Sequence, residues 1–193
     1  MMIRQTDNVD EAVAVLKNNG VVLTACDTVL GLLAPFNEDG LQRLKSIKER
    51  SNSKAFITLI PSLEYLDPLV EDKKSIEKEW IKSHWPGPLT IVFKRHSSCS
   101  SRLTGGHDTI AIRYPNFHPI NTLLERLNAP VFSTSVNKQG EAEALSIDAV
   151  SEDILRKVDI IYNGGQKSPG IPSTIVSARG SSIDILRQGA IAI

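Results

Sequence analysis

The chain has 193 residues, of which 41% are hydrophobic and 23% are charged, and its formal net charge is zero. These values are typical of an ordinary globular protein, and we expect one domain over residues 1–193. Balanced charge argues against bulk electrostatic capture of nucleic acid, and no apolar run approaches the ~20 residues that span a bilayer, so we expect no membrane association.

Cysteine usage and the first residues indicate a compartment. Cys26 and Cys99 lie far apart and form no CxxC pair, so no disulfide framework is predicted. The first residues are polar and lack the apolar stretch of a signal peptide. We therefore expect a cytoplasmic protein.

Apolar spacing predicts helices and strands that alternate along the whole chain. The predicted elements, in chain order, are a helix over 9–16, strands over 21–23 and 56–60 with a helix over 41–47 between them, a helix over 75–84, strands over 89–93 and 109–113, a helix over 119–127, a strand over 130–135, a helix-to-strand unit over 154–161, and strands over 173–176 and 183–186. This order predicts a single α/β domain with mixed strand directions.

Polar side chains fall where the predicted strands end. These residues are Thr24, Arg113, Ser135, Asn137, Ser173 and Arg187. In open α/β sheets that rim is where ligands bind, so the sequence predicts a site there.

A cationic stretch follows the predicted helix over 41–47. Residues 43–54 contain five Lys or Arg side chains and the single acid Glu49. We expect Lys48 and Arg50 at the exposed end of that helix. Cations there suit a polyphosphate, because guanidinium and ammonium groups offset phosphate charge with charge-assisted hydrogen bonds. The alternative is a solvated helix face, which is what most charge runs are.

Several common site types are absent from the sequence. It has no GxxxxGK[ST], GxGxxG, HExxH or GxSxG motif, and its four histidines have no metal-ligand spacing, so no protein-held metal is predicted. Neither cysteine has a catalytic signature, and a small buried thiol is the expected role of Cys26. An enzyme of this kind would work by positioning charged substrates.

Seven short segments form a recognisable set in chain order. They are DTVLGL at 27–32, KER at 48–50, WPGPLT at 85–90, LTGG at 103–106 with TIAIR at 109–113, STSVN at 133–137, PSTIV at 172–176, and LR at 186–187 with Gly189. Taken together, they resemble the YrdC/TsaC family of threonylcarbamoyl-AMP synthases. The chain is similar to the short, single-domain form. The resemblance implies a YrdC-like twisted open mixed sheet with flanking helices and a concave basic cleft.

The resemblance also implies an activity. Family members are nucleotidyltransferases that use ATP, L-threonine and bicarbonate to make threonylcarbamoyl-AMP and pyrophosphate, the first step of tRNA threonylcarbamoyladenosine modification. It implies Mg2+ with the ATP, no tightly bound cofactor, contact with tRNA, and hand-off to a separate threonylcarbamoyl transferase complex.

Matching the motifs residue by residue gives the expected site. The resemblance implies ATP contacts at Lys48, Arg50, Lys54, Thr109, Ser135, Asn137 and Arg187, with Lys48 and Arg50 as the catalytic pair. It implies threonine contacts at Cys26, Thr28, Arg113 and Ser173, with Arg113 able to clamp the carboxylate bidentately.

Two residues depart from the family pattern. Cys26 stands where the family has a threonine, and Leu30 stands where it has a tyrosine. Since a thiol hydrogen-bonds more weakly than a hydroxyl, we expect weaker threonine binding and predict that Cys26→Thr with Leu30→Tyr restores it. Two alternatives stay open: a relative that adenylates another carbamoyl acceptor, and a non-catalytic RNA-binding module, for which an aromatic content of 5% offers few stacking surfaces.

Overall fold

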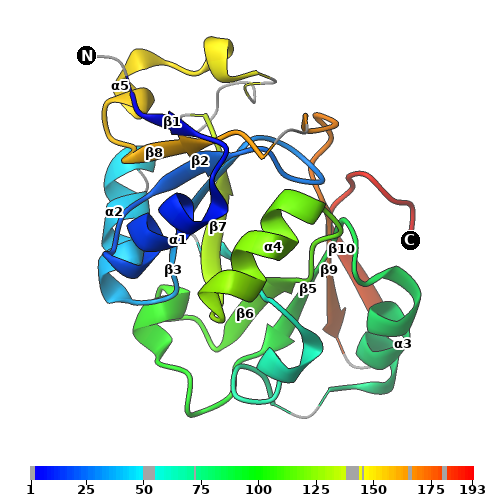
Figure 1. Cartoon of the computed structure of the whole chain (residues 1–193). Helices are drawn as coiled ribbons and strands as arrows, with labels where there is room; N and C mark the ends of the chain where they lie inside the picture. The colour runs from blue at the N-terminus through cyan, green and yellow to red at the C-terminus, as the bar shows by residue number, and fades with distance from the viewer. Residues whose placement is uncertain are drawn as a thin grey trace.

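One twisted, mixed β-sheet organises the chain (Figure 1). The computed structural model describes residues 3–49, 55–71, 73–137, 144, 146–164, 167–179 and 182–193. Within these residues the sheet has ten strands in the order β1-β8-β2-β3-β7-β4-β6-β5-β9-β10. Their bounds in that order are Gln5–Thr6, Ile160–Tyr162, Val22–Thr24, Gly31–Pro35, Val131–Ser135, Ile57–Leu59, Thr109–Arg113, Leu89–Lys94, Thr174–Arg179 and Ser182–Arg187.

Strand directions are mixed, as the sequence predicted. The pairs β1–β8, β8–β2, β4–β6 and β5–β9 are parallel, and the other neighbours are antiparallel. The helices are α1 (Val9–Lys17), α2 (Glu38–Lys48), α3 (Ser75–His84), α4 (His118–Leu127) and the short α5 (Glu152–Leu155). Short 3-10 helices cover Leu63–Tyr65, Ser101–Thr104 and Ile147–Ala149.

Local sequence explains where α2 begins and ends. The side chain of Asn37 accepts a hydrogen bond from the backbone N–H of Gly40 at 2.8 Å, which caps the N-terminus. Leu41, Leu44 and Ile47 are buried at helical spacing. Glu49 then adopts the left-handed conformation with φ of 49°, which stops the helix directly after Lys48.

Two hydrophobic clusters hold the sheet. The larger one contains the buried faces of α1, α2 and α4 with strands β2, β3, β7 and β8. Helices α1 and α4 lie side by side in the view of Figure 1. The second cluster gathers strands β5, β6 and β9 around Trp80 and Trp85, and the indole N–H of Trp85 donates to Leu89 O at 2.6 Å. The WPGP segment therefore packs against the second cluster as a turn.

The fold confirms the predicted class and most elements, and it adds two strands. Strand β1 is only two residues long, and β3 is an apolar run of five residues ending at Pro35. Neither shows a clear alternation, which is why periodicity did not reveal them. Among the described residues, no helix is both long and apolar enough to cross a membrane.

Candidate active site

A cavity of about 380 Å³ lies over the central and C-terminal strands of the sheet. Its floor is a row of residues that the strand register places side by side. Ser133 of β7 pairs with Ile57 of β4, Ile57 pairs with Ala111 of β6, and Ala111 pairs with Val92 of β5. Three of these side chains are apolar, and Ser133 and Ala111 are small. The floor is therefore smooth and leaves room for a ligand above it.

The cavity gathers most of the expected site. The residues that line it include Cys26, Thr28, Lys48, Arg113, Ser135, Asn137, Ser173 and Arg187. Three of these are cations, and among the described lining residues none is Asp or Glu. This cleft is therefore basic, as expected, and suited to anionic ligands.

Three expected residues lie elsewhere or outside the description. Arg50 and Lys54 lie outside the described residues. Thr109 lines a neighbouring hollow, which shares Val92 and Leu186 with the main cavity. Because Thr109 precedes Ala111 by two residues on the same face of β6, its hydroxyl is at the margin of the site and not within it.

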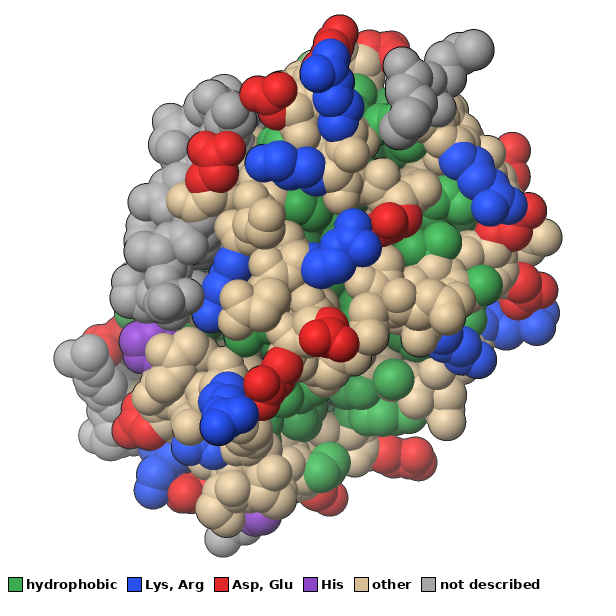
Figure 2. All heavy atoms as spheres, turned by 90° about the vertical axis from the view of Figure 1, so that its left-hand side faces the viewer, with side chains coloured by type: hydrophobic (Ala, Val, Ile, Leu, Met, Phe, Trp, Pro, Cys, Tyr) green, Lys and Arg blue, Asp and Glu red, His purple; other side chains and the backbone are tan. Residues whose placement is uncertain are grey.

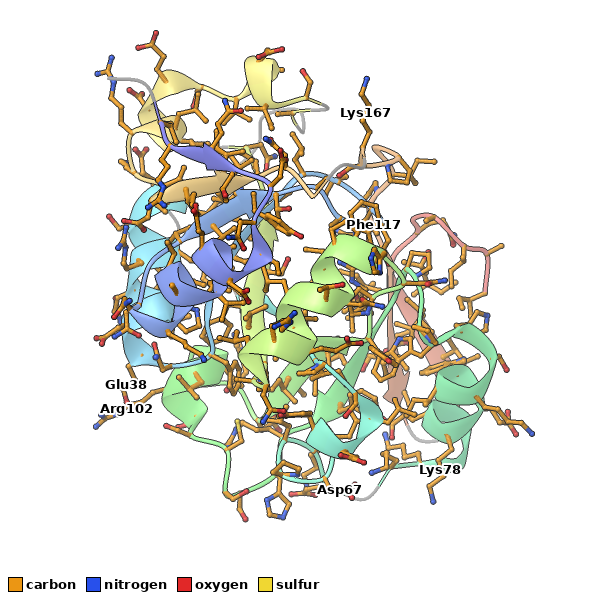
Figure 3. All side chains as sticks on the ribbon, viewed as in Figure 1. Glu38, Asp67, Lys78, Arg102, Phe117 and Lys167 are labelled. Atoms are coloured by element: carbon orange, nitrogen blue, oxygen red, sulfur yellow. The ribbon has the colours of Figure 1, made fainter. Side chains whose placement is uncertain are left out.

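The cationic stretch divides between several environments. Arg43 forms an ion pair with Asp159 at 2.8 Å, and Lys45 lines a separate hollow beside residues 101–106. Among the described cations of this stretch, Lys48 lines the main cavity. On the side that carries α2, basic and acidic side chains are interspersed (Figure 2), and Arg102 pairs with Glu38 at 3.3 Å (Figure 3). Of the three cations of this stretch that the structure describes, Arg43 and Lys45 are partly exposed and lie outside the main cavity, and Lys48 is buried in its lining.

Lys48 joins the end of α2 to the turn after β7. Its ammonium donates to Ser135 O and to Asn137 Oδ1, both at 2.8 Å, and also to Asn137 O. Ser135 Oγ donates to Asn137 Oδ1 at 2.7 Å. Lys48 is only 5% exposed. The expectation that it stands at an exposed helix end is wrong, because the helix ends against the turn and not in solvent.

Arg113 is held by the turn that follows β2. Its Nη1 forms an ion pair with Asp27 Oδ1, and its Nη2 donates to Cys26 Sγ at 3.4 Å. The Cys26 thiol donates to Asp27 Oδ1 at 3.0 Å. The side chains of Arg113 and Asp27 are only 4% and 8% exposed, so this is a buried ion pair.

Burial sets the protonation of this cluster. It raises the pKa of Cys26 to about 11, against the lowering effect of Arg113. The group is therefore a neutral thiol near neutral pH, a poor nucleophile but a donor to Asp27. Burial also disfavours charge on Arg113, yet Cys26 and Asp27 beside it raise its pKa above the usual value, so the guanidinium remains protonated.

The opposite wall is built around Ser173. Its Oγ shares a hydrogen bond with Thr90 Oγ1 at 2.8 Å and accepts another from Arg187 Nη2 at 2.9 Å. Arg187 Nε donates to Ser173 O at 2.9 Å. A Cβ atom on Gly189 would lie only 2.3 Å from Pro172 O, which explains the glycine of this motif. The expected ATP residue Arg187 and the expected threonine residue Ser173 thus form one unit.

Ser168 and Gly170, in the loop before β9, support the turn that follows β2. Ser168 Oγ accepts a hydrogen bond from Cys26 N at 2.9 Å, and Gly170 N donates to Thr28 O at 2.8 Å. Lys167 is exposed and points away from the fold (Figure 3). Among the described residues there is also no group of three or more His, Cys, Asp or Glu that could hold a metal.

Leu30 corrects one expectation. It is 5% exposed, belongs to the larger hydrophobic cluster, and is absent from the described cavity lining. Sequence position alone gave it a place in the pocket, but its side chain packs into the core.

Leu30→Tyr is therefore expected to lower stability by about 1–3 kcal/mol, because a larger side chain with a hydroxyl must enter a packed core. Chemical denaturation would measure the loss, and titration would show no gain in threonine affinity. Cys26→Thr is the matched variant, since Cys26 does line the cavity. A stable Leu30→Tyr protein with tighter threonine binding would contradict the packing argument.

Sequence reasoning gave Asp27 and Thr90 no role in the site. Asp27 lies next to Cys26 within a motif, and Thr90 is fully buried within β5. A carboxylate between a thiol and a strand-end arginine was the available signal for Asp27. For Thr90 there was none, because its partner Ser173 is 83 residues away in the chain.

Comparisons with known proteins found similar sequences along most of the chain. The Sua5/YciO/YrdC family profile, described as telomere recombination, matches residues 14–189. Threonylcarbamoyl-AMP synthase of Coxiella burnetii (strain RSA 493 / Nine Mile phase I) is 34% identical over 163 residues, which cover 82% of this chain and 86% of the relative. The synthase of Pyrococcus abyssi (strain GE5 / Orsay) is 29% identical over 181 residues, covering 93% of this chain and 53% of the relative.

Solved structures give the same fold. P. abyssi Sua5 complexed with L-threonine superposes with a TM-score of 0.89 at 28% identity, over 98% of this chain and 58% of that chain. This chain thus spans somewhat more than half of Sua5. E. coli YciO, at 21% identity, has a TM-score of 0.83 over 97% of this chain and 94% of its own, which bears on the fold alone.

Proposed function

Because this chain belongs to the Sua5/YciO/YrdC family, we propose that it is a nucleotidyltransferase that makes threonylcarbamoyl-AMP from ATP, L-threonine and bicarbonate. The observation that carries the proposal is the clustering of Lys48, Arg113 and Arg187 around one cavity whose described lining has no carboxylate. All three substrates bring negative charge to that cavity. The names of the C. burnetii and P. abyssi relatives supply the reaction.

The chemistry requires little more than positioning. The amine of threonine combines with bicarbonate to give a carbamate, whose oxygen attacks the α-phosphorus of ATP and releases pyrophosphate. Negative charge accumulates on the phosphoryl oxygens and the leaving group as this occurs. Fixed cations and N–H groups in a cavity stabilise that charge without having to reorganise. Lys48 and Arg187 are the described residues of the proposed phosphate side, and Ser135 and Asn137 lie beside Lys48.

The amino-acid side is proposed around Arg113. Its buried guanidinium would bind the threonine carboxylate, with Cys26, Thr28 and Ser173 around the rest of the molecule. The L-threonine complex of P. abyssi Sua5, a chain of the same fold, supports L-threonine as a ligand. The proposed threonine site therefore lies between Arg113 at the end of β6 and Ser173 just before β9.

We propose that Mg2+ enters together with the triphosphate. Mg2+ is usually bound by phosphate oxygens, waters and one or two carboxylates, and the described cavity lining offers no carboxylate. The phosphates would therefore supply the metal's main ligands, and the metal would neutralise part of their charge. We also propose cytoplasmic action as the first step of tRNA modification, with tRNA contact and product hand-off to a separate transferase complex.

A second candidate keeps the chemistry and changes the amino acid. It is favoured by Cys26, which lines the cavity where the family has a threonine. An RNA-binding role without catalysis has less support, because the described site is a small enclosed cavity with no aromatic stacking surface other than Phe56.

Pyrophosphate release tests the proposal. Purified protein is incubated with ATP, Mg2+ and bicarbonate, and each of the 20 amino acids is added separately. We expect release that depends on L-threonine and on bicarbonate, with little activity when either is omitted. Activity with a different amino acid would support the second candidate, and release independent of both would exclude this reaction.

A further inference from the structure

Asp27 joins three separate segments at the amino-acid side of the cavity. Its Oδ1 accepts from Arg113 Nη1 at the end of β6 and from the neighbouring Cys26 thiol. Its Oδ2 accepts from the backbone N–H of Asn116 at 3.1 Å, in the segment that leads to α4. Asp27 is not itself among the described lining residues of the cavity. It can therefore act on a ligand only through lining residues that it holds, Arg113 and Cys26.

The donors of Arg113 are used unequally. A guanidinium has two edges suited to a carboxylate, one formed by Nη1 and Nη2 and the other by Nε and Nη2. The first edge faces Asp27 and Cys26. On the second edge, Nε is buried and has no hydrogen-bond partner among the described residues. A buried donor without a partner is unfavourable, and such groups are rare unless a ligand or water completes them.

From this arrangement we propose that Asp27 is a positioning residue that holds one edge of Arg113 and thereby presents the Nε–Nη2 edge to the substrate carboxylate. Arg113 lines the cavity, so this residue borders the space that a ligand would fill. The inference rests on the proposed function, because it assigns the amino-acid carboxylate to that edge. Beyond that function, it gives Asp27 a role without substrate contact, and it gives the guanidinium of Arg113 an orientation toward the substrate.

The competing explanation is a structural brace, in which the Asp27–Arg113 pair only ties the β2 turn to β6. A brace and a positioning residue differ in what they discriminate. Loss of a brace weakens the binding of every ligand of the cavity, whereas loss of positioning weakens the binding only of ligands that carry the carboxylate. L-Threoninol differs from L-threonine only by replacing that carboxylate with a hydroxymethyl group, so it separates the two explanations.

Asp27→Asn is the informative substitution. It keeps the size of the side chain, removes its charge, and turns one acceptor into an N–H donor that faces either Arg113 or the N–H of Asn116. We expect affinity for L-threonine, measured by calorimetry, to fall about tenfold or more, which is the order of one charged hydrogen bond. Affinity for L-threoninol and for ATP should change less than about twofold, so the threonine-to-threoninol ratio falls.

Asp67→Asn is the matched control. Asp67 pairs with Lys73 at 2.8 Å and is largely exposed. It lies at the edge of the molecule, far from the turn that follows β2 (Figure 3). The same chemical change there should leave the affinity ratio unaltered. Equal loss of both ligands in Asp27→Asn, or an unchanged ratio, would overturn the positioning role and leave a brace.

If the Asp27→Asn variant fails to fold, a measurement on the wild-type protein tests the proposal instead. In 15N NMR spectra of the free protein, the Nη groups of Arg113 should give separate signals because Asp27 restricts their rotation. L-Threonine should shift the Arg113 Nε–H signal, and L-threoninol should not. If wild type binds no L-threonine, the proposed function fails; if it binds L-threonine without a shift of the Arg113 Nε–H signal, or L-threoninol shifts that signal equally, the positioning role is overturned. A single averaged Nη signal would overturn it.

Discussion

Lys48→Met is expected to lose activity and stability together. The ammonium donates to two backbone carbonyls and one side-chain oxygen of the turn after β7, and the apolar side chain would remove these three hydrogen bonds. Unsatisfied buried acceptors cost about 1–3 kcal/mol, which lowers Tm by roughly 2–4 °C per kcal/mol for a domain of this size. Loss of one charged phosphate contact should reduce kcat/KM about 10- to 150-fold.

Lys45→Met is the matched control for that variant, because Lys45 lies on the same helix and lines a different hollow. Thermal unfolding and pyrophosphate release are measured on both proteins. If Lys48→Met melts at the wild-type temperature but loses activity, Lys48 does not stabilise the turn. Early melting with full activity would mean that it does not act on phosphate.

Arg113→Met is expected to have the largest effect on stability. It leaves the Asp27 carboxylate buried without its cation, and breaking a buried pair from one side costs about 3–5 kcal/mol. Threonine binding should fall at least about tenfold, because the proposed carboxylate partner is gone. Urea denaturation and threonine titration measure the two effects separately.

The double variant Arg113→Met with Asp27→Asn separates structure from binding. Removing both charges relieves the uncompensated carboxylate, so much of the stability should return. Threonine affinity should stay as low as in Arg113→Met. If the double variant is less stable than Arg113→Met alone, Asp27 is stabilised by groups other than Arg113. If threonine binding returns with the stability, Arg113 is not the carboxylate partner.

The fold and the family could be predicted because local signals agree with the global structure. Leu41, Leu44 and Ile47 predicted α2 from their spacing, and the strand that ends at Arg113 carries its polar residue at the rim, where the cavity lies. Eight of the expected site residues line that cavity. The motifs found them because residue type and chain position are visible in a sequence.

The sequence could not predict in which direction a side chain points or which distant residues it hydrogen-bonds to. Lys48 looked like a solvated helix end, but its partners Ser135 and Asn137 are 87 and 89 residues away. Leu30 lies four residues from Cys26, yet one side chain enters the core and the other lines the cavity. Thr109 is displaced from the site because strand register, and not motif membership, decides which residues share a floor.

Product analysis with isotope-labelled bicarbonate tests the central claim most directly. The protein is incubated with ATP, Mg2+, L-threonine and 13C-bicarbonate. The nucleotide products are then separated, and their masses are measured by mass spectrometry. We expect threonylcarbamoyl adenylate that contains one 13C atom, formed together with one pyrophosphate and strongly reduced with Arg113→Met. A product that lacks the 13C atom, or AMP alone with no threonine attached under rapid quenching, would contradict it.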